Sequence, residues 1–195
     1  MKFYINKYSY LIKEIPDVSF IPMLMRRKLD TLGKAGLCTL YQVLEEKKDF
    51  NLVFASQYGD IERVLKLIEQ RKNEGEISPT GFSFSVHNAT IGLFSLLNSI
   101  KTSYNSISAG ENTLSYGLLE AILTCKEKPT IFCFTENEKE LQSVSLSCSI
   151  NNEEGIEVTL KQEKNSKIDT FKDFISFLNG TKQCYYSDLY TLTRG

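Results

Sequence analysis

A glycine and a glutamate stand where a predicted strand turns into a predicted helix, within SISAGENTLSYGLLEA at 106–121. Many enzymes present a nucleophile at such a turn, because the free amides of a helix N-terminus stabilise negative charge. Gly110 permits the tight turn, and Glu111 supplies the side chain. The dipole that stabilises a carboxylate there also makes it a weaker base and nucleophile. The common role of such a glutamate is structural and contributes about 0.3 to 1 kcal/mol to the helix.

The only histidine, His87, lies in SVHNA, directly before an apolar segment. A lone histidine is more often a hydrogen-bonded structural group than a catalyst. A nucleophile–base pair would need a serine or cysteine within hydrogen-bond reach of it. The serine candidates are Ser85, Ser108 and Ser115. SYG at 115–117 lacks the leading glycine of a GxSxG turn, so the sequence gives hydrolase chemistry little support.

Composition indicates an ordinary globular domain. The chain has 195 residues, 42% hydrophobic and 24% charged, with a net charge of −1. We therefore expect one domain over 1–195 and no nucleic-acid partner. The first ten residues lack the apolar core of a signal peptide, and no apolar run reaches the roughly 18 residues of a membrane span. These patterns predict a cytoplasmic protein without a membrane span.

The cysteines favour neither disulfides nor a metal. There are five of them, no two forming a CxxC pair: Cys38, Cys125, Cys133, Cys148 and Cys184. An odd number among apolar neighbours is typical of reduced, mostly buried thiols. With a single histidine and no clustered ligand spacing, we expect no metal site and no cofactor.

Helical and strand patterns alternate along the chain. Helices are expected at 26–46, 61–73 (with Asp60 as N-cap), 88–100, 112–124 and 170–178. Strands are expected at 50–57, 82–86, 104–109, 130–136, 141–150 and 156–161, the last two as a hairpin through NNEEG. Residues 20–24 are expected to be extended and 78–81 a loop. The tail with Tyr185, Tyr186 and Tyr190 receives no element. The alternation predicts a layered α/β sheet.

Four stretches resemble the β-ketoacyl-synthase-like N-terminal domain family. They are IPMLMRRKLDTLGKAGL, LVFASQYGDIERVLKLI, ISPTGFSFSVHNATIGLFSLL and SISAGENTLSYGLLEA. That family comprises short ketosynthase relatives from bacterial gene clusters for aryl polyene and related polyketide pigments. The resemblance covers about 20–136, and the SPT-FS-SVHNA block is its most specific part. It implies a thiolase-like half with a mixed sheet and flanking helices, a core over about 20–161 and a family-specific helix and tail at 165–195.

The resemblance also assigns a role to the turn at Glu111. Ketosynthases carry the acyl chain as a thioester on a cysteine at a strand-to-helix elbow. Counting back ten residues from Ala121 places that cysteine at Glu111, and Gly117 falls at a small-residue position of the helix. The two histidines that assist condensation belong to a half that this chain does not contain. A carboxylate cannot hold an acyl chain as a thioester.

Two further groups of residues gain candidate roles from the resemblance. Phe82, Phe84, Phe94 and Leu97 could line an acyl pocket, although an apolar set of this kind is ordinarily core. Arg26, Arg27 and Lys28 could contact an acidic acyl carrier protein, although three cations at a helix start are ordinarily a solvated face.

Three functions remain open from the sequence. The favoured one is an inactive ketosynthase relative, a structural or chain-length-modulating partner that forms a homodimer or a heterodimer with a ketosynthase. The second is a small acyl-thioester hydrolase, decarboxylase or acyltransferase that acts on acyl carrier protein through Glu111 with His87 or a serine. The third is a module that binds an acyl chain or an acyl carrier protein without catalysis.

Overall fold

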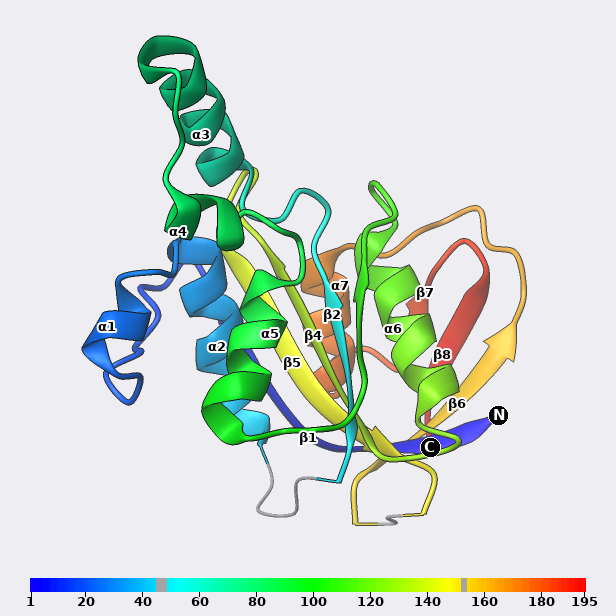
Figure 1. Ribbon diagram of the computed structural model, residues 1–195. Coiled ribbons are helices and arrows are strands. Elements are labelled where there is room, and N and C mark those ends of the chain that lie inside the picture. Colours follow the sequence, from blue (N-terminus) through cyan, green and yellow to red (C-terminus); the bar gives the residue numbers. More distant parts are fainter. Residues whose placement is uncertain (45–48, 152–153) are drawn as a thin grey trace.

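One eight-stranded sheet organises the chain (Figure 1). The computed structural model describes residues 1–44, 49–151 and 154–195. The strand order is β3-β2-β4-β5-β1-β6-β8-β7, in which β3, β2 and β4 are parallel and the rest are antiparallel. The strands are β1 (Lys2–Ile12), β2 (Asn51–Ala55), β3 (Tyr104–Ile107), β4 (Thr130–Glu136), β5 (Gln142–Ser149), β6 (Ile156–Gln162), β7 (Cys184–Tyr186) and β8 (Tyr190–Arg194).

Helices cover both faces of the sheet. They are α1 (Met23–Arg26), α2 (Thr31–Val43), α3 (Ile61–Glu74), α4 (Pro79–Ser83), α5 (Ala89–Asn98), α6 (Thr113–Thr124) and α7 (Phe171–Leu178). Helices α2 and α5 pack on one face, and α6 and α7 on the other. The expected layered α/β class, a mixed sheet with flanking helices, is confirmed.

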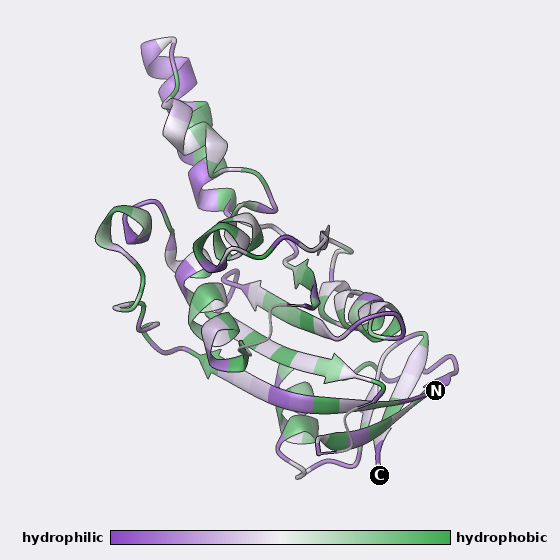
Figure 2. Cartoon of the chain, turned by 60° about the horizontal axis from the view of Figure 1, so that its bottom comes forward, coloured by the Kyte–Doolittle hydropathy of each residue, from purple (hydrophilic) through white to green (hydrophobic). Residues whose placement is uncertain are grey.

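The side chains of β2 and β4 face two hydrophobic cores, one on each side of the sheet. Val53 and Ala55 face α6, whereas Leu52 and Phe54 face α2 and α5. In β4 all residues but the last, Glu136, are buried, because alternate side chains enter opposite cores. The strand TIFCFTE is therefore covered on both faces, as its continuous apolar run predicts. Figure 2 shows these hydrophobic strands in the centre of the molecule.

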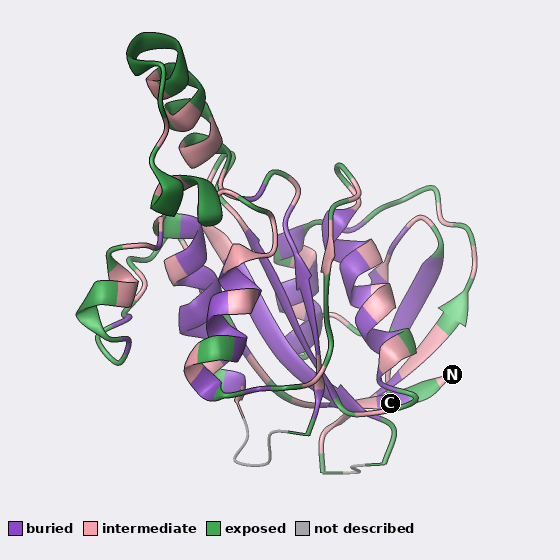
Figure 3. Cartoon of the chain, in the orientation of Figure 1, coloured by how far each residue is buried: buried purple, intermediate pink, exposed green. Residues whose placement is uncertain are grey.

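Helices α3 and α4 project from this body (Figures 1 and 3). No residue of α3 is buried, and its outer end is hydrophilic (Figure 2). Asp60 caps α3 by accepting a hydrogen bond from the Arg63 amide at 2.9 Å, as expected. None of the helices in the described ranges has the length and apolarity that crossing a bilayer requires.

Residues 78–86 fold differently from the prediction. The loop at 78–81 and the strand at 82–86 are both wrong, because Pro79–Ser83 forms α4. Ser78 caps this helix through a hydrogen bond from the Gly81 amide at 3.1 Å, and Pro79 occupies the first turn, where its missing amide costs nothing. The Ser-Pro pair is a helix-start signal that the sequence reasoning read as a loop.

The long helix expected at 26–46 also starts later than expected. The short α1 takes in the end of the segment predicted as extended, 20–24, and the first residue of the helix predicted from residue 26. Helix α2 begins only after Asp30, whose carboxylate accepts a hydrogen bond from the Gly33 amide at 2.7 Å. The predicted helix end near 46 lies outside the described residues.

The predicted hairpin of 141–150 and 156–161 is wrong in its pairing. Both strands form, but β1 lies between them and is hydrogen-bonded to each. The tail that received no element forms β7 and β8, and it places Tyr185 and Tyr190 in the core. Both termini bind β6: the Met1 ammonium donates to the Leu160 carbonyl, and the Gly195 amide donates to the Glu157 carbonyl.

Candidate functional site

The turn between β3 and α6 has the elbow geometry that the sequence predicts. Gly110 has φ +58°, a left-handed conformation in which a side chain is strained. The Thr113 hydroxyl accepts a hydrogen bond from the Ala109 amide at 2.9 Å and donates to the Gly110 carbonyl at 2.6 Å. This clamp closes the turn, so that Glu111 lies two residues before the first residue of α6.

A glycine brings the elbow helix onto the sheet. A Cβ built on Gly117 would lie 2.6 Å from the Ala55 Cβ and 3.0 Å from the Phe132 ring. Both partners are fully buried, one on β2 and one on β4. The backbone of α6 therefore rests directly on the two strands, which explains the small residue at this position.

Glu111 lines a hollow where three parallel strands end. The carboxyl ends of β2, β3 and β4 lie at the same end of the sheet because these three strands are parallel. Gln57, Glu111 and Glu136, which follow or end these strands, line a cavity of about 200 Å³. The Glu111 side chain is exposed to solvent.

Other carboxylates surround Glu111. Glu136, Glu138 and Asp169 line the same cavity. The Glu136 carboxylate accepts hydrogen bonds from the Gln57 amide at 2.6 Å, and Asp169 forms an ion pair with Lys182 at 2.6 Å. The hollow thus has acidic walls, which disfavour an anionic ligand beside Glu111. Within the described ranges no group of histidine, cysteine or acidic side chains has the arrangement of a metal site.

No cysteine takes the place of the elbow nucleophile in the cavity at Glu111. All five are free thiols, and none lines the cavity at Glu111. Burial raises the pKa of Cys133 to about 12, which keeps that thiol protonated. Cys125 lies at the opposite end of α6 from the elbow. A thiolate at a helix N-terminus, on which condensation depends, is therefore missing from this turn.

His87 holds a turn together and does not face Glu111. Its Nε2 lies 2.6 Å from the Ser56 carbonyl oxygen, and its ring meets the Phe54 ring edge-on at 5.8 Å. Gly59 approaches the same ring so closely that a Cβ would lie 3.3 Å away. The cavity that His87 lines and the cavity that Glu111 lines share no residue.

The three candidate serines are committed to backbone carbonyls. Ser85 donates to Phe82 at 2.8 Å, Ser108 to Gln57 at 2.8 Å and Ser115 to Asn112 at 3.0 Å. Among the described residues, none of the three is hydrogen-bonded to His87. The geometry brings together no serine–histidine pair.

The four candidate acyl-pocket residues divide between core and surface. Phe94 is fully buried and contacts Tyr41, while Phe84 and Leu97 pack against the same core. Phe82 is 58% exposed on α4. The structure thus brings three of the four to one core and separates the fourth, because α4 projects away from the sheet.

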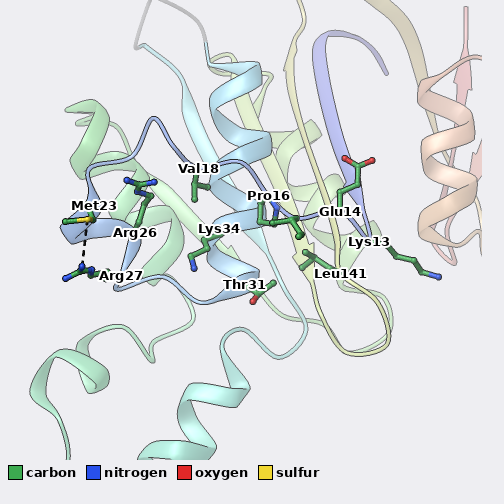
Figure 4. A pocket seen from close by; sticks show the side chains of 11 residues that line it. Lys13, Glu14, Pro16, Val18, Met23, Arg26, Arg27, Thr31, Lys34 and Leu141 are labelled. Atoms are coloured by element: carbon green, nitrogen blue, oxygen red, sulfur yellow. Dashed lines mark hydrogen bonds between the residues drawn. The ribbon is translucent and has the colours of Figure 1, made fainter.

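The three candidate cations also divide. Arg26 and Arg27 line a groove between α1, α2 and the 13–18 loop (Figure 4). Lys28 turns away and lies over the Phe84 ring at 5.7 Å. The groove includes Lys34 and Leu141, which the sequence reasoning missed because the lining segments are far apart in the chain. No local motif connects them.

The mixed sheet and the helices on both faces match the thiolase-like fold of ketosynthases. A family model confirms this class independently of the structure. The model described as "Beta-ketoacyl synthase, N-terminal domain" matches residues 7–165, and the chain belongs to this family. No match was found among curated proteins.

Solved structures of the same fold resemble the chain. One is "Ketosynthase (ApeO) in Complex with its Chain Length Factor (ApeC) from Xenorhabdus doucetiae", with a TM-score of 0.79 and 17% identity over 100% of both chains. "The ishigamide ketosynthase/chain length factor" has a TM-score of 0.60 and 10% identity, covering 83% of this chain and 68% of the other. An AntDE:AntF complex of a type II acyl-carrier protein with its ketosynthase has a TM-score of 0.61 and 9% identity, covering 84% and 70%.

Proposed function

We propose that this protein is a ketosynthase relative that does not condense acyl groups. In this proposal it is a structural or chain-length-modulating partner in polyketide or fatty-acid-like biosynthesis of the aryl polyene type. The observation that carries the proposal is Glu111 at the β3–α6 elbow, where the family resemblance places the acyl-bearing cysteine. We propose that the protein acts in the cytoplasm, together with the ketosynthase and the carrier protein.

The chemistry of the two side chains supports this interpretation. Condensation begins when a thiolate accepts the acyl group as a thioester, which is reactive enough to be attacked by the next unit. A carboxylate would form a mixed anhydride instead, and the exposed side chain of Glu111 would leave such an anhydride open to water. The tight turn at Gly110 and the close packing of α6 on the sheet are both present, although the elbow has a carboxylate in place of a cysteine sulfur.

An exposed strand edge supports a protein partner. Strand β3 ends the sheet, and β2 is its only neighbour among the described strands. The Ser103 carbonyl accepts a hydrogen bond from the Leu52 amide of β2, and the Ile107 carbonyl accepts one from the Ser56 amide just after β2. By the alternation of a strand, the backbone groups of Tyr104 and Ser106 therefore point outward. Such an edge can pair with another chain. We propose that it pairs with a ketosynthase or with a second copy of this protein, and that Arg26, Arg27 and Lys28 contact the acyl carrier protein.

The test is a reconstitution with the ketosynthase and carrier protein of the same organism. The protein alone should form no carbon–carbon bond from an acyl primer and a malonyl carrier protein, and Glu111→Ala should leave that result unchanged. Added to the ketosynthase, it should co-elute with it and change the chain length of the product. Elongation by the protein alone, or a product distribution that ignores its presence, would refute the proposal.

A matched pair of variants tests the edge. Ser106→Pro removes an amide that faces away from β2, a change that an edge strand tolerates, whereas Ser106→Ala keeps the amide. We expect the proline variant to stay folded by circular dichroism and to lose co-elution, and the alanine variant to keep it. Equal binding by both folded variants would exclude pairing through β3.

A further inference from the structure

The groove of Figure 4 is separate from the elbow. Its volume is about 710 Å³, within the range of small-molecule sites. It is lined by the 13–18 loop, α1, the first turns of α2 and Leu141. None of its residues lines the cavity at Glu111.

Its walls combine two kinds of surface. The apolar wall consists of Ile15, Pro16, Val18, Met23 and Leu141. Part of this wall is unusually open to water, since Ile15 is 96% and Met23 55% exposed. An apolar surface around a concave site is typical of ligand binding, because burial by a ligand would remove it from water.

The second surface is a cation trio of Arg26, Arg27 and Lys34. None of the three forms an ion pair with a carboxylate of the described residues. The Arg26 Nε is buried and has no hydrogen-bond partner there, and a buried unsatisfied donor is costly. The nearest interaction of the Arg27 guanidinium is a contact of 3.9 Å with the Met23 sulfur.

Nearby carboxylates offset the charge of the trio only in part, since Asp17 of the 13–18 loop attracts Arg26 without forming an ion pair. Lys13 is held by Glu140 at 2.7 Å, and Glu14 is the only carboxylate in the lining. In Figure 4 the charged ends of both Lys13 and Glu14 point away from α1. The trio therefore forms a net positive end beside an apolar wall.

We propose that this groove binds an amphiphilic anion, with a carboxylate or phosphate head group on the cation trio and an alkyl chain on the apolar wall. Binding would place an anion beside cations that form no ion pair within the described ranges and would cover the exposed apolar side chains. Free fatty acids and phosphate-bearing acyl groups share this chemistry. The inference does not rest on the proposed function, because a free amphiphile requires neither a ketosynthase nor a carrier protein.

Calorimetric titration of the full chain tests the proposal with four probes below their micellar concentrations. They are decanoate, decyl phosphate, decanol and inorganic phosphate. We expect decanoate or decyl phosphate to bind, and decanol and inorganic phosphate to bind at least about tenfold more weakly, because each lacks one half of the recognised chemistry. The preferred head group identifies a carboxylate or a phosphate as the natural source.

Charge-reversal variants locate the site. Lys34→Glu should weaken decanoate binding by about tenfold or more, whereas Lys66→Glu, the same change on the projecting α3, should not alter it. Met23→Asp should weaken the binding of decanoate through the apolar wall, and melting curves would show that each variant is folded. Equal affinity for decanol and decanoate, equal effects of the two lysine variants, or no binding of either anion would overturn the proposal.

Discussion

Substitution of Gly117 by alanine should destabilise the protein, although alanine is the better helix former. Gly117 lies inside α6, where alanine favours the helix by about 1 kcal/mol. The new Cβ would lie 2.6 Å from the Ala55 Cβ, where carbon atoms normally stay about 3.5 to 4.0 Å apart. The helix or the strand must move by roughly 1 Å, because both partners are buried and the neighbouring Phe132 ring lies at 3.0 Å.

The expected size of the effect follows from these two opposing contributions. Overpacking a dense core costs about 1 to 3 kcal/mol, and the close contacts on two strands place this site toward the upper end. After the gain in helix propensity, we expect the free energy of unfolding to fall by about 1 to 2 kcal/mol. For a chain of this size that lowers the melting temperature by roughly 2 to 8 °C.

Gly92 on α5 provides the matched control. A Cβ there would meet only the Tyr104 hydroxyl, at 3.6 Å, which is an ordinary contact. Gly92→Ala should therefore stabilise the protein by about 0.5 to 1 kcal/mol through helix propensity alone. Ala55→Gly combined with Gly117→Ala should recover much of the loss, because it removes the nearest opposing atom.

Urea unfolding followed by circular dichroism at 222 nm measures five proteins: the parent, Gly117→Ala, Gly92→Ala, Ala55→Gly and the double variant. A Gly117→Ala variant as stable as the parent would refute the close packing of the elbow helix. The double variant gives a second test. If its free energy of unfolding lies below that of Gly117→Ala by the full cost of Ala55→Gly alone, the two changes are independent and the close packing is refuted.

Three other predictions concern titratable groups. Hydrogen bonding, first of all from Lys13, lowers the pKa of Glu140 to about 2. The contribution of Glu140 to the free energy of unfolding is therefore present above the ordinary carboxyl pKa and is lost as the pH falls from about 4.5 to 2. Over this interval the stability of Glu140→Gln should drop less than that of the parent. In the native protein at pH 8 a thiol reagent should modify Cys184 first, and buried thiols such as Cys133 only on unfolding; rapid modification of several thiols would contradict the burial. His87→Ala should lower the free energy of unfolding by roughly 1 to 2 kcal/mol without altering partner binding. A variant that is as stable as the parent but no longer binds its partner would contradict the structural role of His87.

Local signals predicted the elbow and its helix well. The small and polar residues at 108–112, followed by an apolar helical pattern, specify a strand, a turn and a helix within sixteen residues. The cap at Asp60 and the helix at 171–178 were equally local, since Thr170 and Asp173 form a capping box. Elements of this kind depend on a few neighbours in the chain, which a single sequence displays.

Strand β1 could not be recognised in this way, because a bulge interrupts its alternation. Phe3 and Ile5 enter the core beneath α6 and α7, but the register shifts at Asn6. Beyond that shift Tyr8 packs against this core, and Leu11 enters the opposite one. The extra residue reverses which positions face each core, so no period of two runs through the strand. Its place between β5 and β6 depends on pairing across the whole chain, which explains why a hairpin was predicted there.

The tail shows that the elbow is braced from a distant part of the chain. The Tyr190 hydroxyl donates to the Ser115 carbonyl at 2.7 Å, and the Tyr116 hydroxyl donates to the Asp188 carboxylate at 2.7 Å. Both bonds hold the first turns of α6 from residues beyond the matched range 7–165. In the proposed role Glu111 carries no acyl group, and the stiff elbow instead positions β3, the strand that ends the sheet. The bracing therefore fits the proposed partner role better than a catalytic one, because an edge that pairs with another chain must be held in register.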